Sequence, residues 1–554
     1  MSRTLTPDTT LEILKKDAKR WLKALRAGDA GARDRLLAAT PAAPAFPGLR
    51  DVQFALAREY GLAGWSALRE ALEDLALARR SDAERTGIVL HSAWQGDRAA
   101  AARILARWPQ TGAGGIRMAV ATGNLAEVRR QLAADPTLAA RKGGPLDWEP
   151  LLYLAYARLP GGERNGPEMA RLLLDHGADP NARFDDGWGN PFTVLTGIIG
   201  EGEGDKPPHP QAADLADLLV ERGADPFDTQ ALYNTSITRD ETRWLDFLWT
   251  RCARRGTTDL WHVPGTPGIG GKISLSPLDY LLGNAVAYNH LLRAEWLVVH
   301  GANADGVHAY SGRPLREEAL IHGHVEMADL LARHGAATPP LTGQAAFQAA
   351  IMQLDRAAAQ AAAHAHPECL RDAAPMLIAA RRGRADMVAL LLDLGMDADV
   401  MDETEQRGLH NAAGNGALEV ARLLIARGAD IDRPTTRFGG PMGFAAHFGH
   451  REMAALLAPL SRDVVELTYL GMKERVRELL AADPSLANAA QGKYGIIPLF
   501  ALPDDDAEAV EMAELLLSFG ADPNATNNEG LTAEQAARTR GLIDAADLMR
   551  GEAD

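Results

Sequence analysis

The sequence predicts an all-α solenoid in which one short helical unit is copied along most of the 554-residue chain. Three observations predict this fold. A segment that joins an amphipathic helix to a turn recurs at intervals close to 33 residues, and glycine follows these helices at a fixed place. Hydrophobic residues make up 46% of the chain and aromatic residues only 6%, with much Ala and Leu, which favours helices over sheets.

Residues 1–82 lack the repeated unit and are predicted to form a helical cap. The Pro-rich PAAPAFPG interrupts four helix-like stretches: TTLEILKKDAKRWLKALRAGD, ARDRLLAAT, LRDVQFALAREYG and GWSALREALEDLALARR. Terminal repeats of a solenoid expose an apolar face that must be covered. We therefore expect residues 1–82 to cover the first repeat, and the polar, Ala-rich residues 531–554 to close the other end as a capping repeat.

Residues 83–554 are predicted to form the repeat array. The segment EMARLLLDHGADPNA returns as DLADLLVERGADPFD, EVARLLIARGADID and EMAELLLSFGADPNA. In each copy Leu and Ile recur at helical spacing, and a glycine then supplies the left-handed residue that ends the helix, as at Gly177, Gly223, Gly428 and Gly520. A second, shorter helix precedes each copy, as in GLHNAAGNGA, where small alanines permit close packing.

This unit resembles the ankyrin repeat. Residues 151–182, 408–432 and 498–525 follow its order of a Pro-Leu-His-like helix start, Ala-Ala, a Gly-His-like turn, an apolar second helix and Gly-Ala-Asp-x-Asn. Gly395 and Gly428 are 33 residues apart, the period of that family. The resemblance covers residues 88–554 as about 13 or 14 repeats with short hairpin fingers. LAREYGLAGWSALREAL is similar to the helical segment that often precedes ankyrin arrays in bacterial proteins.

The resemblance implies a binding protein. Ankyrin arrays bind through the tips of their hairpin fingers and the concave side of their first helices, because stacking does not need those positions. The largest departures from the pattern lie between residues 141 and 280. Insertions near 200–210 and 256–275 lengthen the spacing of the capping glycines, and loops of this length are more often functional than structural.

The second insertion contains GTPGIGGKIS, which shares features with a phosphate-binding loop. That loop needs glycine, four residues and then Gly-Lys-Ser/Thr, after a buried strand. Thr266 stands where the first glycine should be, Ile273 stands where the hydroxyl should be, and no apolar strand precedes them. We interpret the segment as surplus chain between two repeats that carries Trp261 and His262 toward the groove.

Aromatic and acidic residues gather in the same region. Three tryptophans stand just before first helices, in GGPLDWEP, FDDGWGNP and TDLWHVPG, each with Asp or His nearby. If the array stacks in register, these side chains lie along one wall of the groove. Trp94 and Tyr156, on the concave helix face, would lie beside them. The alternative is that each tryptophan packs against its own hairpin. The candidate binding residues are Trp94, Asp147, Trp148, Tyr156, Asp185, Asp186, Trp188, Trp261 and His262.

A more basic and polar stretch follows farther along the chain. The concave helix positions there hold Arg381, Arg382, Asn415, His447 and Phe448. We interpret them as a solvated face, with a second part of the groove as the alternative.

Catalytic and metal chemistry find little support. His364, His366 and Cys369 have a compact spacing that zinc would accept, but they fall on the turn after a second helix and lack a fourth ligand. Cys252 lies among arginines in TRCARR, no histidine is spaced to act as its base, and we expect a buried helix cysteine. The GxSxG, HExxH and GxGxxG motifs are absent, so no catalytic residue, metal or cofactor is predicted.

Charge and cysteine content exclude further classes. The chain has 58 Lys and Arg against 74 Asp and Glu, a net charge of −16, which argues against nucleic acid as a partner. Two scattered cysteines make no disulfide framework, the N-terminus has no apolar export signal, and no apolar run approaches a membrane span. We expect a cytoplasmic protein that does not bind membranes.

These observations predict a non-catalytic recognition scaffold that binds a protein or peptide partner through the concave groove and the fingertips, with its principal site in residues 141–280. Aromatic anchors would supply affinity, and carboxylates would select a basic or hydroxyl-rich partner. The alternative is a small-molecule-binding protein or enzyme with a Trp-lined acidic pocket in the same region, covered by the inserted loops.

Overall fold

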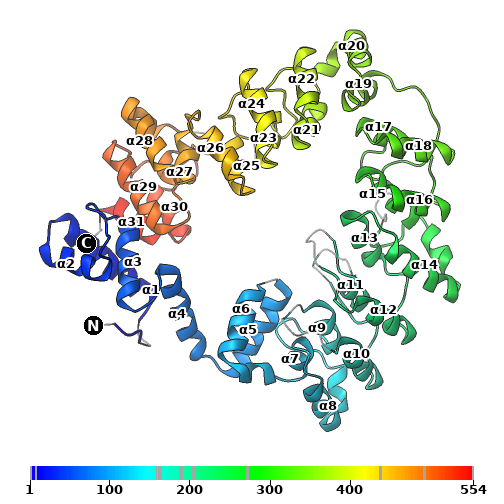
Figure 1. Cartoon of the computed structure of the whole chain (residues 1–554), viewed down its shortest axis with the longest axis horizontal. Helices are drawn as coiled ribbons and strands as arrows, with labels where there is room; N and C mark the ends of the chain where they lie inside the picture. The colour runs from blue at the N-terminus through cyan, green and yellow to red at the C-terminus, as the bar shows by residue number, and fades with distance from the viewer. Residues whose placement is uncertain are drawn as a thin grey trace. The chain divides into compact units, whose positions relative to one another are not determined.

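The structure is a computed structural model of the chain (Figure 1), and it describes every residue except 1–2, 7–8, 96, 158, 160–164, 186, 188–190, 203–206, 270–273, 436–438, 491–494 and 552–554, and the side chains of residues 95 and 113. Helices dominate the described residues and the strands are few and short, so the predicted all-α solenoid is confirmed. The chain divides into two compact units, residues 77–341 and residues 1–76 with 342–554.

Within the described ranges, each unit contains seven successive helix pairs, in agreement with the predicted number of repeats. We call the members of a pair the first and the second helix. The pairs of the unit 77–341 are α5 (Asp82–Gln95) and α6 (Arg98–Arg107), α7 (Ile116–Ala121) and α8 (Leu125–Ala134), α9 (Pro150–Tyr156) and α10 (Gly166–Asp175), α11 (Val194–Ile199) and α12 (Ala212–Glu221), α13 (Thr229–Thr238) and α14 (Arg243–Arg255), α15 (Pro277–Ala287) and α16 (Leu291–Val299), and α17 (Leu315–Ile321) and α18 (Val325–Arg333).

The other unit holds the remaining pairs and the N-terminal helices. Its pairs are α19 (Gly343–Met352) and α20 (Arg356–Ala365), α21 (Ala374–Arg381) and α22 (Ala385–Asp393), α23 (Gly408–Gly414) and α24 (Leu418–Ala426), α25 (Pro441–His447) and α26 (Arg451–Leu457), α27 (Val464–Tyr469) and α28 (Lys473–Ala482), the 3-10 helix η6 (Pro498–Phe500) and α29 (Asp506–Ser518), and α30 (Ala533–Thr539) and α31 (Ile543–Arg550). The N-terminal helices are α1 (Leu11–Arg26), α2 (Ala30–Ala39), α3 (Leu49–Glu59) and α4 (Trp65–Ala78).

Glycine ends second helices as the sequence predicts. After α22 and α24, Gly395 and Gly428 have φ angles of 95° and 92°, a conformation that residues with a β-carbon rarely adopt. The amide of Gly428 donates to the carbonyl oxygen of Ile425 at 3.0 Å, and the amide of Ala429 donates to that of Leu424 at 3.0 Å. The last carbonyls of α24 are thereby satisfied, and the chain leaves the helix at a defined residue.

Short antiparallel fingers connect the pairs. Strands β1 (Arg183–Asp185) and β2 (Pro191–Thr193) form a paired finger, with Phe184 opposite Phe192. Isolated β-bridges mark further fingers: Gly143 with Trp148, Val307 with Pro314, Met401 with Arg407, and Thr526 with Thr532. The predicted hairpin fingers are therefore present in both units.

Small side chains allow successive first helices to pack closely. Ala379, Ala412 and Ala445, on α21, α23 and α25, are all fully buried. Leucines of the second helices, such as Leu391 and Leu424, are buried against them in one continuous core. Burial of this kind, repeated along each unit, supplies most of its stability.

The N-terminal helices contact the last repeats of the array. Lys15 of α1 pairs with Asp506 of α29, and Lys19 pairs with Asp544 of α31. We expected this segment to cover the first repeat, and that expectation stays a prediction. The contact with the last repeats was not predicted, because it rests on a match of charge between segments about 500 residues apart, which no local pattern reveals. The predicted boundary at residue 82 stays a prediction.

Candidate functional site

Four aromatic side chains pack together in the unit 77–341. Trp94 and Tyr156 come from the first helices α5 and α9, and Trp148 and Phe184 come from fingers. The ring centroids of Trp148 and Phe184 are 4.4 Å apart, and that of Trp94 lies 5.3 to 5.4 Å from the other three. We call these four residues the aromatic cluster. It brings together three of the residues that the sequence placed in one site, although their role in binding stays a prediction.

Trp148 lies beneath the surface of this site. Its side chain is only 6% exposed, so the expectation of an exposed anchor is wrong for this residue. The Nε of Arg117 donates to the backbone oxygen of Trp148 at 3.2 Å, and the hydroxyl of Tyr153 donates to that of Gly143 at 3.0 Å. These bonds hold the finger 143–148 against α7 and α9. The ring of Trp148 in turn packs against the rings of Trp94 and Tyr156.

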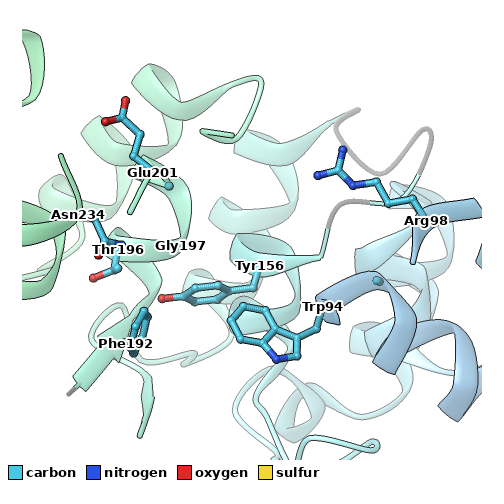
Figure 2. Close-up of a pocket in the computed structure, with 10 residues that line it drawn as sticks. Trp94, Arg98, Tyr156, Phe192, Thr196, Gly197, Glu201 and Asn234 are labelled. Carbon is cyan, nitrogen blue, oxygen red and sulfur yellow. The ribbon is translucent and has the colours of Figure 1, made fainter. Parts of the chain in front are cut away.

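A small pocket opens beside the aromatic cluster (Figure 2). Trp94, Tyr156 and Phe192 form its apolar side, and Arg98 extends from α6 toward it. Its volume is about 70 Å³, whereas pockets for small molecules usually hold about 300–1,000 Å³. The space therefore suits the end of one side chain. The lining residues are Ala93, Trp94, Arg98, Tyr156, Phe192, Thr196, Gly197, Gly200, Glu201 and Asn234.

Two buried polar side chains line the other side of the pocket. Glu201 is 4% exposed, and its Oε2 accepts a hydrogen bond of 2.8 Å from the hydroxyl of Thr238. The Oδ1 of Asn234 accepts a hydrogen bond of 2.8 Å from the side-chain Nε2 of Gln230. Burial raises the pKa of Glu201, and the bond from Thr238 opposes that rise. Glu201 belongs to the first insertion, so this insertion contributes a lining residue to the pocket.

Asp228 fixes the elements behind the pocket. It is the N-cap residue of α13 and accepts hydrogen bonds from the hydroxyls of Thr193 and Thr196, the latter at 3.0 Å, and from the amide of Ala231 at 3.0 Å. Burial raises the pKa of Asp228, and these hydrogen bonds act in the opposite direction. Through them one carboxyl ties the end of β2 and the start of α11 to α13, and so positions Thr196 in the pocket wall.

Trp261 belongs to a separate aromatic group on the second helices. It lies in the 3-10 helix η3 (Thr258–His262), is fully buried, and has its ring centroid 5.2 Å from that of Trp249 of α14 and 6.2 Å from that of Trp296 of α16. The expectation that the second insertion carries Trp261 and His262 toward the groove is therefore wrong. The alternative of a single pocket lined by both Trp148 and Trp261 is wrong for the same reason.

Two carboxylates on the fingers beside the aromatic cluster are exposed. Asp147 lies at the tip of the finger 143–148 with a φ angle of 52°, and Asp185 ends β1, where its Oδ1 accepts a hydrogen bond of 2.7 Å from the amide of Gly187. Asp147 directly precedes Trp148 in the sequence, and Asp185 directly follows Phe184. Asp186 and Trp188 lie outside the described residues.

Several residues of the aromatic cluster and of the pocket were missed from the sequence. Phe184 and Phe192 stand at equal distances on either side of position 188, the spacing of a cross-strand pair around a turn, and this signal could have revealed them. Arg98, Glu201 and Asn234 carry no local signal, because they meet only through the stacking of α6, α11 and α13.

Comparison with known proteins supports the repeat. A family model of ankyrin repeats (three copies) matches residues 349–435 and 376–468. The chain therefore contains ankyrin repeats. It is similar to the putative ankyrin repeat protein YahD of Escherichia coli (strain K12), 25% identical over 189 residues, which cover 32% of this chain and 94% of that protein. It is also similar to ankyrin repeat and SOCS box protein 5 of Oryctolagus cuniculus, 28% identical over 135 residues, 24% of this chain and 33% of that protein.

The described part of the chain gives three further observations. It contains no helix long and apolar enough to cross a membrane, and no three His, Cys, Asp or Glu side chains that gather to hold a metal ion. Cys252 and Cys369 are both buried, and burial raises the pKa of each thiol. Phe448, in the more basic stretch of first helices, is 58% exposed.

Proposed function

We propose that this ankyrin-repeat protein binds a protein or peptide partner through the first helices and fingers of the unit 77–341, and that one partner side chain enters the pocket beside Trp94 and Tyr156. The observation that carries the proposal is the size of the pocket together with its walls. About 70 Å³ between aromatic rings accommodates a single anchoring side chain, as protein interfaces commonly do.

The charges around the pocket favour a partner of basic or mixed character. Asp147 and Asp185 are exposed on the fingers, and Glu201 lines the pocket. These groups attract basic side chains that surround the anchor, and such rim charges mainly increase the rate of association. Arg98 at the opposite edge favours an acidic residue on one side of the anchor.

For the pocket beside Trp94, the small-molecule alternative is weaker. The pocket is several times smaller than the usual site for a metabolite, and Trp261 is buried elsewhere. A binding surface for a macromolecule does not need a large cavity.

A site-specific photo-crosslinker tests the proposal. p-Benzoylphenylalanine is placed at Arg98, which lines the pocket, or at Arg107, which is exposed at the other end of the same helix α6. In cells that make the protein, we expect one partner to crosslink from position 98 and to be identified by mass spectrometry. Equal crosslinking from both positions, or none from position 98, would contradict the proposed site.

The Arg98→Glu variant supplies an independent readout. Its side chain is exposed, so the fold should be unaffected, whereas affinity for the crosslinked partner should fall about fivefold, the effect of a rim or edge charge worth roughly 1 kcal/mol. Arg107→Glu is the matched control, because it changes the net charge equally on the same helix.

A further inference from the structure

The N-terminal helices and the last repeats meet through complementary charge. Lys15, Lys19 and Arg26 follow one side of α1 at helical spacing, and carboxylates of α29 and α31 face them. The Nζ of Lys19 is 2.6 Å from the Oδ1 of Asp544. The guanidinium of Arg26 donates two hydrogen bonds, of 2.6 and 2.9 Å, to the carboxylate of Glu514. A bidentate pair of this kind fixes the orientation of the helix as well as its position.

Two more ion pairs complete the contact. The Nζ of Lys15 is 3.4 Å from the Oδ2 of Asp506, and Arg50 of α3 pairs with Glu508. We call Asp506, Glu508, Glu514 and Asp544 the acidic face. Its carboxylates crowd one another: burial raises the pKa of Asp506, the charge of Asp544 adds to the rise, and Lys15 opposes it. The repulsion among these carboxylates is therefore reduced when a basic helix covers the acidic face.

Apolar contact between the two parts is small. The N-terminal helices have their own core, which includes Leu14, Trp21 and Leu56, and among described residues Ala507 of α29 is the buried residue that the repeats add to it. Release of the segment would consequently expose little apolar surface and leave α1–α3 with its core.

The strength of such a contact depends on salt and on connection through the chain. Arg26 and Arg50 are 50% and 67% exposed, and each pair of this kind contributes about 0–1 kcal/mol and is screened by ions. Attachment to the same chain makes docking of its own segment an intramolecular step, which does not depend on protein concentration. Docking within one chain therefore prevails over docking between chains, although both use the same residues.

We propose that the acidic face is a docking surface for the α1–α3 segment of a second copy of this chain. In an isolated molecule, the acidic face is occupied by the α1–α3 segment of the same chain. Where that segment is displaced, the segment of another copy docks through the same four ion pairs and links the two molecules, as in domain swapping. The occupant is set by the charge complementarity that the four pairs already display.

Two full-length variants with reversed charges test this proposal. The first carries a reversed basic side and the second a reversed acidic face, so that each repels its own segment while the mixture offers matched charges between molecules. The changes are Lys19→Glu, Arg26→Glu and Arg50→Glu in the first, and Glu508→Arg, Glu514→Arg and Asp544→Lys in the second.

Analytical ultracentrifugation at low ionic strength, about 0.05 M, gives the readout, because screening is weak there. We expect each variant alone to sediment with the 59.3 kDa mass of one chain, and an equimolar mixture to form a complex of twice that mass that dissociates in high salt. A mixture that remains monomeric while both variants are folded overturns the proposal.

One chain that carries all six changes is the matched control. Its charges are again complementary within the molecule, so it should remain monomeric, keep the melting temperature of the parent protein and form no complex with either the parent or itself. If Asp544→Lys prevents folding, the changes at 26, 50, 508 and 514, which are less buried than Asp544, serve the same test alone, with the same two outcomes.

Discussion

The hydroxyl of Tyr156 donates a hydrogen bond of 2.6 Å to the backbone oxygen of Thr193. This bond joins α9 of one repeat to the end of β2 in the next. The ring of Tyr156 lies directly on Gly197 of α11, where a β-carbon would come within 2.5 Å of it. The pocket wall thus depends on one phenol and one glycine that let two repeats approach closely.

Gly197→Ala should destabilise the unit 77–341. The added methyl group has no space against the ring of Tyr156, and overpacking of a core costs about 1–3 kcal/mol. Urea unfolding followed by circular dichroism measures the change. The control is Gly87→Ala in the middle of α5, where a β-carbon meets nothing within 4 Å and alanine should stabilise the helix by up to about 1 kcal/mol. Equal effects at both positions would contradict the close contact.

Tyr156→Phe isolates the hydrogen bond from the ring. The aromatic cluster keeps its packing, while the backbone oxygen of Thr193 loses a donor, so we expect a loss of about 1 kcal/mol in the free energy of unfolding. Partner crosslinking from position 98 should persist, because the apolar side of the pocket is retained. A loss as large as that of Tyr156→Ala would show that the hydroxyl has a further role.

Trp261→Ala should act on stability and leave binding intact. The ring is fully buried between Trp249 and Trp296, and truncation of such a residue costs about 3–5 kcal/mol. At temperatures where the variant remains folded, its affinity for the partner should equal that of the parent protein. A selective loss of affinity in a fully folded variant would restore Trp261 as a contact residue.

The fold could be predicted from the sequence because its signals are local and repeated. The helix pairs, the fingers and the glycines that end the helices, such as Gly395 and Gly428, follow from spacing and backbone conformation within one repeat. Each signal is weak alone, and repetition makes it strong. The position of the N-terminal segment could not be predicted, because Lys19 and Asp544 meet through complementary charge rather than through sequence spacing.

The candidate site was predicted only in part. The concentration of Trp, Tyr and Asp between 141 and 280 identified the region, and Trp94, Trp148 and Tyr156 do lie together. Burial could not be predicted, because it depends on contacts between repeats. Trp261 resembles Trp148 in its turn position but packs on second helices, and only the stacked structure separates the two.

His410 should make the unit that contains residues 342–554 less stable in acid. Its ring is fully buried, its Nε2 lies 2.8 Å from the backbone oxygen of Arg433, and burial lowers its pKa to about 4. Because the folded pKa is depressed, the unfolded chain binds a proton first, and stability is lost as the pH falls below about 6.5. His410→Gln should be less stable than the parent at pH 7, and the difference should narrow toward pH 4.5. A constant difference in urea unfolding would contradict the buried neutral ring.

Glu466 should have the opposite dependence on pH. Its carboxyl is buried on α27, its Oε1 accepts a hydrogen bond of 2.9 Å from the amide of Gly443, and burial raises its pKa to about 7. The folded pKa lies above the unfolded one, so the folded state holds the proton longer and stability falls as the pH rises from about 4.5 to 7, with no further loss above that. The shift corresponds to a free energy on the order of 3 kcal/mol.

The Glu466→Gln variant removes this ionisation. Its stability relative to the parent should increase between pH 4.5 and 7 and then remain constant, because only the parent must place a charge in the buried site. Glu419→Gln, at an exposed position of α24, is the control and should show a difference that does not vary with pH. His410 titrates over nearly the same pH range with the opposite effect on stability. The stability of the parent should therefore change little with pH in this range. In Glu466→Gln, stability should rise with pH, because only the effect of the neutral histidine remains.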